Sequence, residues 1–158
     1  MWRRLLWGLN LASRAPRCPI RRGMSQTVTL IRSADLSDVA EYASAATAPA
    51  EARLIFRAGV CPLYLDGRTA GVGDYAAQAS EAVEDLVTAL RAAGAELSDV
   101  LSTRVLVASS KQSDLVDAWA VNRDAFRPHD VPNTLMGVTI LGYTDQLVEI
   151  EAVAAAID

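Results

Sequence analysis

A chain of 158 residues is long enough for one domain with its own hydrophobic core. Apolar residues make up 51% of it and charged residues 22%, a balance that excludes an intrinsically disordered chain. The net charge of −4 weighs against nucleic acid as a partner, because binding phosphates requires clustered Lys and Arg.

The first segment of the chain, residues 1–23, is a basic extension. It holds six arginines and no acidic residue, so residues 24–158 keep nine basic against 19 acidic residues, a net charge of −10. Three interpretations stay open: a mis-assigned start upstream of Met24, a mitochondrial transit peptide, or an extension of unknown role. The first favours a cytoplasmic protein and the second a mitochondrial one. In each case we expect one domain over residues 24–158.

Hydrophobic periodicity in this domain alternates between strand and helix patterns. It predicts strands at 27–32, 54–59, 100–108, 135–141 and 147–155, helices at 74–93 and 113–126, and a loop or short helix at 37–51. In the last strand, apolar residues alternate with Glu149 and Glu151, so one face is apolar and the other mixed. We expect an α+β fold in which two helices cover one face of a mixed sheet of about five or six strands. An oligomer would bury the other face.

Residue types that bind metals or cofactors are sparse. Cys18 and Cys61 do not have the spacing of a disulfide framework or a zinc site, and we interpret both as free thiols in a reducing compartment. The single histidine, His129, lies in an expected loop, which predicts a solvated side chain rather than a metal ligand. No apolar stretch reaches the roughly 18 residues of a membrane span. We therefore expect no cofactor, no metal and no membrane partner.

Four sequence blocks resemble the YjgF/RidA family. They are Ala58–Pro62, similar to S/A-G-x-x-P; Gln78–Gly94, similar to Q-x7-L-x3-L-x2-A-G; Asp99–Val107, similar to D-V-x4-V-x-V; and Pro132–Ala154, similar to P-A-R-S…V-E-I-E-x-I-A. Each block is weak alone, but their order and spacing over about residues 28–156 are specific. The resemblance implies a chorismate-mutase-like fold, a homotrimer with a central barrel, and ligand clefts between subunits.

The resemblance also implies an activity. The best-known branch of the family hydrolyses reactive imines and enamines, such as 2-aminoacrylate, to keto acids and ammonia. In that branch the arginine of P-A-R-S binds the substrate carboxylate, and here Thr134, after Asn133, holds its position. Loss of a charged, bidentate contact costs a few kcal/mol, on the order of 10²-fold in affinity. The expected ligand is therefore less anionic than aminoacrylate.

Other site residues follow from the same resemblance. Glu149 matches the glutamate that orients the attacking water, and it is the expected catalytic base. Tyr42 matches a tyrosine at the cleft entrance, and Ala58, before Gly59, replaces a cleft serine. Trp119 falls at the position of a ligand-binding asparagine, although a tryptophan at helical spacing more often belongs to a core.

The missing arginine leaves two functions open. One is a hydrolytic deaminase of an imine, enamine or related small C–N metabolite, and the other is a non-catalytic trimer that binds a small metabolite. Arg104, on the strand beside the signature segment, is a candidate replacement cation, with a surface or intersubunit salt bridge as the competing interpretation. A ribonuclease, a third function associated with the family, would need a basic groove that the sequence does not display.

Overall fold

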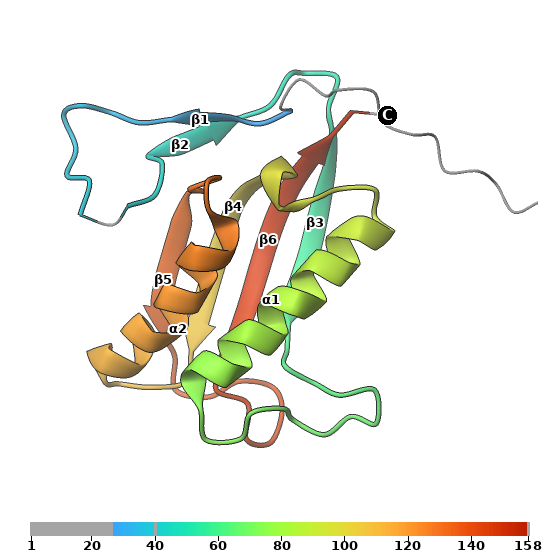
Figure 1. Ribbon diagram of the computed structural model, residues 1–158, viewed down its shortest axis with the longest axis vertical. Helices are drawn as coiled ribbons and strands as arrows, with labels where there is room; N and C mark the ends of the chain where they lie inside the picture. Colours follow the sequence, from blue (N-terminus) through green and yellow to red (C-terminus); the bar gives the residue numbers. More distant parts are fainter. Residues whose placement is uncertain (1–26, 40, 158) are drawn as a thin grey trace, which may run out of the picture.

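The computed structural model describes residues 27–39 and 41–157, and it packs two helices against one face of a four-stranded mixed sheet (Figure 1). The predictions for residues 1–23 and Cys18 lie outside the described residues. The elements are β1 (Thr29–Ile31), β2 (Ala45–Thr47), β3 (Arg53–Val60), α1 (Tyr75–Ala92), the 3-10 turn η1 (Leu97–Asp99), β4 (Val100–Val107), α2 (Gln112–Phe126), β5 (Asn133–Gly137) and β6 (Val148–Ala156). The α+β prediction with two helices on one face is confirmed.

The main sheet has the order β3-β6-β4-β5, with the C-terminal strand in an inner position. β6 pairs antiparallel with both neighbours, whereas β4 and β5 are parallel and are joined by α2 as a crossover. Arg104 in β4 lies opposite Glu151 in β6 and Thr134 in β5. The register of β3 shifts between Arg57 and Val60, which re-aims the end of this strand towards the start of β6.

The first long helix, α1, begins and ends at the predicted signals. Asp74 caps it by accepting a hydrogen bond from the Ala77 N–H at 2.9 Å, and Gly94 follows it with a φ of +76°. Its buried apolar face consists of Ala79, Ala82, Val83, Leu86 and Leu90. Full burial of a leucine such as Leu86 contributes about 1.5–3 kcal/mol to stability.

A buried glutamine connects α1 to the start of β6. The Gln78 amide donates to the Asp145 carbonyl at 2.8 Å, and its Oε1 accepts from the Leu147 N–H at 2.7 Å. These bonds satisfy backbone groups of a turn that would otherwise be buried without a hydrogen-bond partner. The position of the turn before Glu149 is therefore set by the helix layer.

Three predictions about elements were wrong. The main sheet has four strands rather than five or six, because β1 and β2 form a separate two-stranded sheet. Residues 37–51 contain β2 and no helix. The strand expected at 135–141 begins earlier and ends at Gly137, since β5 pairs with β4 only over the five residues from Asn133. Short strands carry too few residues for a period of two to be visible.

The prediction that the His129 side chain is solvated was also wrong. His129 is 5% exposed, and its Nε2 donates to the Val100 carbonyl at 2.7 Å. The ring fills the junction between the end of α2 and the start of β4, where a backbone acceptor needs a partner.

Neither of the two helices in the described part of the chain is long and apolar enough to cross a membrane.

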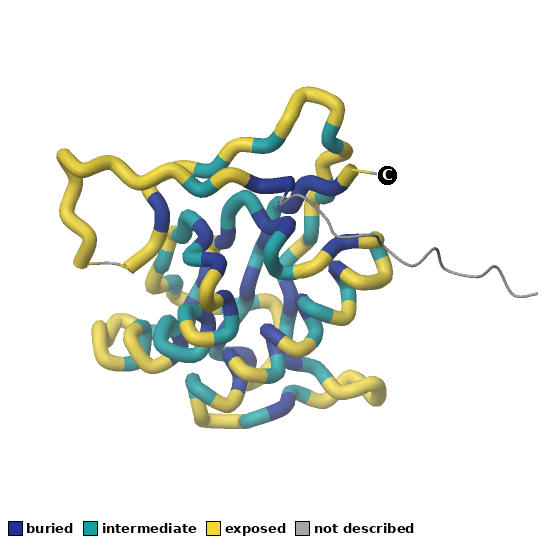
Figure 2. The backbone as a smooth tube through the Cα atoms, turned by 45° about the horizontal axis from the view of Figure 1, so that its top comes forward, coloured by how far each residue is buried: buried dark blue, intermediate teal, exposed yellow. Residues whose placement is uncertain are grey.

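The two faces of β6 differ as the alternation predicts. Val148, Ile150, Ala152 and Ala154 are buried beneath the helices, while the other face of the sheet is open. That open face carries Glu149, Glu151, Val153, Leu54, Phe56, Arg104 and Met136. Phe56 is 76% exposed. The loop before β2 is exposed over most of its length, in contrast to the buried strands at the centre (Figure 2).

Candidate functional site

The most elaborate polar arrangement on the open face surrounds Glu149. Its Oε2 accepts hydrogen bonds from Gln146 Nε2 at 3.0 Å and from the Cys61 thiol at 3.5 Å. The carboxylate lies over Gly59, where a Cβ would collide with it, so the glycine makes room for it. Its Oε1 has no hydrogen-bond partner among the described residues and is not one of the buried unpartnered atoms. One carboxylate oxygen is therefore held by two donors, and the other makes no hydrogen bond to a described residue.

Gln146 is itself fixed. It is 4% exposed, its Oε1 accepts from the Tyr143 N–H at 3.0 Å, and its Nε2 also donates to the Val148 carbonyl at 3.3 Å. Sequence reasoning missed Gln146, because it lies in the turn before β6, where no periodic pattern marks it. It also missed the role of Cys61, which it treated only as a free thiol.

Cys61 has a perturbed thiol. Burial, followed by the negative charge of Glu149 and the hydrogen bond to it, raises the pKa of Cys61 to about 11. All three effects penalise the thiolate, so the thiol stays protonated at neutral pH and acts as a donor. Such a cysteine is a poor nucleophile, which leaves Glu149 as the reactive group of this cluster.

Alkylation of Cys61 tests this cluster directly. At pH 8 a pKa of about 11 leaves roughly 10²-fold less thiolate than a pKa near 9, partly offset by higher intrinsic nucleophilicity. We expect iodoacetamide to modify Cys61 roughly tenfold more slowly than glutathione in a Cys18→Ser background, with the rate rising up to about pH 11. In Glu149→Gln the rate should increase. A wild-type rate that levels off near pH 9 would contradict the described cluster.

Tyr42 and Trp119 lie together but apart from the Glu149 cluster. Their rings form an edge-to-face pair with centroids 5.9 Å apart and an interplanar angle of 89°. Beneath them, with Asn122, lies a cavity of about 10 Å³, which has room for no more than a water molecule. Both amide atoms of Asn122 are buried without a partner in the described part of the protein, so a water there would satisfy them.

Thr134 and Asn133 point to opposite sides of β5. Thr134 is exposed on the open face, next to Arg104, whose Nη1 forms an ion pair with Glu151 Oε2 at 3.2 Å. Asn133 instead lies on the helix side, where its Nδ2 donates to the Thr103 hydroxyl at 2.6 Å. Its Oδ1 is buried without a partner among residues 27–39 and 41–157.

The predicted site residues therefore fall into separate groups within one chain. Glu149 lies with Ala58 and Gly59, where β3 meets β6. Thr134 lies two strands away, about 10 Å across the sheet at a strand spacing of 4.7–4.9 Å. A ligand held by both sets would require either a long molecule or a second copy of the chain.

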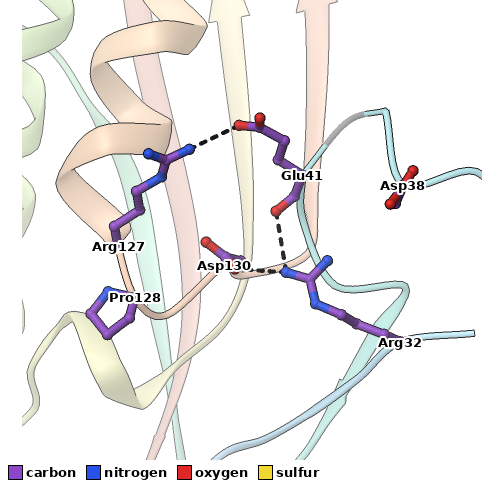
Figure 3. A pocket seen from close by; sticks show the side chains of 6 residues that line it. All are labelled: Arg32, Asp38, Glu41, Arg127, Pro128 and Asp130. Carbon is purple, nitrogen blue, oxygen red and sulfur yellow. Dashed lines mark hydrogen bonds and ion pairs between the residues drawn. The ribbon is translucent and has the colours of Figure 1, made fainter.

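A further cavity lies elsewhere and is lined by none of the predicted site residues. It measures about 460 Å³ and is lined by Arg32, Asp38, Glu41, Arg127, Pro128 and Asp130 (Figure 3). Arg32 binds the Asp130 carboxylate at 2.6 Å, and Arg127 binds the Glu41 carboxylate at 3.0 Å. These two ion pairs hold the loop before β2 against the segment after α2. Both arginines therefore already have carboxylate partners. No group of three metal-ligating side chains occurs in the described residues.

Comparisons with known proteins agree with this architecture. The sequence matches the family model described as Endoribonuclease L-PSP over residues 33–156. A comparison with curated proteins gave no match.

Solved structures give close matches over most of the chain. YyfB from Yersinia pestis, a protein of unknown function of the Rid family, aligns with a TM-score of 0.76 at 26% identity, covering 82% of this chain and 99% of that chain. Rv2704 from Mycobacterium tuberculosis, of the YjgF/YER057c/UK114 family, aligns with a TM-score of 0.56 at 29% identity, covering 82% and 99%. Yeast Mmf1, at 20% identity and a TM-score of 0.58, covers 81% and 98% and shows the fold alone.

Proposed function

This chain belongs to the YjgF/Rid family, whose sequence model is described as Endoribonuclease L-PSP, and from that premise we propose that it is a hydrolytic deaminase of a small imine, enamine or related C–N metabolite. The observation that carries the proposal is the Glu149 carboxylate, with one oxygen held by two donors and the other without a hydrogen-bond partner among the described residues. A carboxylate that is fixed through one oxygen and has the other without a hydrogen bond is suited to activating water.

The reaction uses one water and releases one ammonia. Glu149 Oε1 takes a proton from water as the water oxygen bonds to the C=N carbon and the π electrons move to nitrogen, and Glu149 passes this proton to the nitrogen. Glu149 then takes the hydroxyl proton of the adduct and delivers it to the nitrogen as the C–N bond breaks, giving a carbonyl compound and ammonia. Glu149 shuttles a proton and is regenerated.

The preferred substrate is less anionic than 2-aminoacrylate. Thr134 offers one neutral hydroxyl where the deaminating branch has an arginine, and the neighbouring Arg104 is bound to Glu151. This exposed ion pair is weak, yet a ligand carboxylate would still have to compete with it. Neutral or weakly charged imines do not have to compete with Glu151 for Arg104.

We further propose that the working form is a homotrimer. The open sheet face exposes Leu54 and Phe56 beside charged residues, and Thr134 is too far from Glu149 for one small ligand to touch both. A second copy placed against this face would bury the apolar side chains and bring one chain's Thr134 towards the neighbour's Glu149.

A non-catalytic metabolite-binding trimer is the second candidate, because the Thr134 hydroxyl in place of the arginine removes the group that grips the substrate in the deaminating branch. Hydrolysis of RNA has less support, since residues 24–158 carry a net charge of −10. Ammonia release from a panel of imines, generated in situ by an amino-acid oxidase, separates the candidates. The deaminase gives enzyme-dependent ammonia, with neutral imines preferred, whereas the binding protein gives saturable binding and no turnover.

Introducing the arginine tests the assignment of substrate class. In Thr134→Arg, we expect kcat/KM for imines that carry a carboxylate to rise at least tenfold relative to neutral imines, because a guanidinium forms a bidentate pair with a carboxylate. Thr134→Val, which keeps the shape and loses the hydroxyl, is the matched control and should bring no such gain. Equal effects of the two variants on acidic imines would contradict the assignment.

A further inference from the structure

We propose that Gln146 and Cys61 are positioning residues for Glu149, which fix its Oε2 and leave Oε1 as the single oxygen presented to the attacking water. This inference rests on the proposed function, since it assigns roles within that site. Cys61 and Gln146 lie within two of the sequence blocks, but at positions that the motifs leave unspecified.

The geometry distinguishes the two carboxylate oxygens. Both donors converge on Oε2, with Gln146 Nε2 at 3.0 Å and Cys61 Sγ at 3.5 Å, while Oε1 receives no hydrogen bond from any described residue. A free glutamate side chain can rotate its carboxylate and exchange the two oxygens. Two donors on one oxygen restrict that rotation, which lowers the cost of reaching the reactive orientation.

Gln146 is the stronger of the two positioning residues. Its amide cannot turn over without losing the bonds to the Tyr143 N–H and the Val148 carbonyl, and it is nearly inaccessible to water. An amide N–H is also neutral, so it orients the carboxylate without supplying a proton to it. The orientation of Glu149 is thus determined by the turn that Gln78 attaches to α1.

Cys61 holds the same oxygen from the β3 side. A thiol is a weak donor, and at 3.5 Å its contribution is smaller than that of the amide. The raised pKa of Cys61 keeps the proton on sulfur, so a donor rather than a repelling thiolate faces the carboxylate. Gly59 completes the arrangement, because a side chain at this position would displace the carboxylate.

The test compares four variants with wild type in the full chain. Gln146→Leu removes the amide, Cys61→Ala removes the thiol donor, and Cys61→Ser keeps a donor. Gln112→Leu, at the exposed start of α2, is the matched control. A 1 Å misplacement of a catalytic group can cost about 10²-fold in rate. We expect kcat to fall 10- to 100-fold in Gln146→Leu and a few-fold in Cys61→Ala, with KM within threefold, and Cys61→Ser to recover most of the loss.

Crystal structures of wild type and Gln146→Leu give a readout that does not depend on turnover. We expect one Glu149 orientation in wild type and several, or a rotated one, in Gln146→Leu. An unchanged Glu149 orientation in Gln146→Leu would overturn the inference even if no imine is hydrolysed. So would a Gln146→Leu variant with wild-type kcat while Glu149→Gln is inactive. Absence of turnover with the predicted reorientation would instead reject the proposed function and leave the positioning role intact.

Discussion

In Glu149→Gln, ammonia release from the preferred imine is expected to fall by about 10²–10⁴-fold, the usual contribution of a positioned general base. Glutamine has the shape of glutamate and keeps an oxygen that can accept hydrogen bonds from Gln146 and Cys61, but an amide cannot take a proton from water. The fold and the ligand affinity should therefore change little. The result should appear in kcat rather than KM.

A matched control separates the role of the base from a general effect of charge removal. Glu84 lies on the exposed side of α1, and Glu84→Gln should keep the wild-type rate. Circular dichroism of the two variants should coincide with that of wild type. If Glu149→Gln keeps more than a tenth of the wild-type kcat, Glu149 is not the base, and a binding role becomes the better account.

Phe56→Asp is expected to convert the proposed trimer into single chains and to abolish turnover. Phe56 is 76% exposed on the open face of the isolated chain, and a trimer would bury three copies of it. Each buried phenylalanine contributes about 1.5–3 kcal/mol, and an unpaired buried carboxylate costs several more. Light scattering should give a mass near three chains for wild type and near one for the variant.

Leu65→Asp is the control for this experiment, because Leu65 is fully exposed in the turn after β3 and away from the sheet face. It should stay trimeric and active. Retained helix content in Phe56→Asp would show that activity was lost through dissociation rather than unfolding. A wild-type mass of one chain, with full activity, would contradict the proposed intersubunit site.

The regular elements with strong periodic patterns could be predicted from the sequence. The helix over residues 74–93 was visible in its cap, its apolar stripe and Gly94, and the two-faced strand that carries Glu149 was visible in its alternation. The family comparison confirms the recognition that rested on the four sequence blocks. These features depend on residues that lie close together in the sequence, so the sequence alone reveals them.

The contacts that shape the site could not be predicted in this way. Cys61 contacts Glu149 because the register shift in β3 changes the direction of the end of that strand. Gln146 contacts Glu149 because Gln78 holds the turn in which Gln146 lies. The burial of His129 depends similarly on a carbonyl 29 residues away. Such pairs are far apart in sequence and follow no period, so only the assembled fold reveals them.

A crystal structure of the protein with a bound carbonyl product tests most directly whether a small C–N substrate is hydrolysed at Glu149. The product should lie beside Glu149 with its carbonyl carbon one water away from Oε1, and with Thr134 of a second copy closing the site. A product bound instead in the cavity between Arg32 and Arg127, with the surroundings of Glu149 empty, would contradict the account.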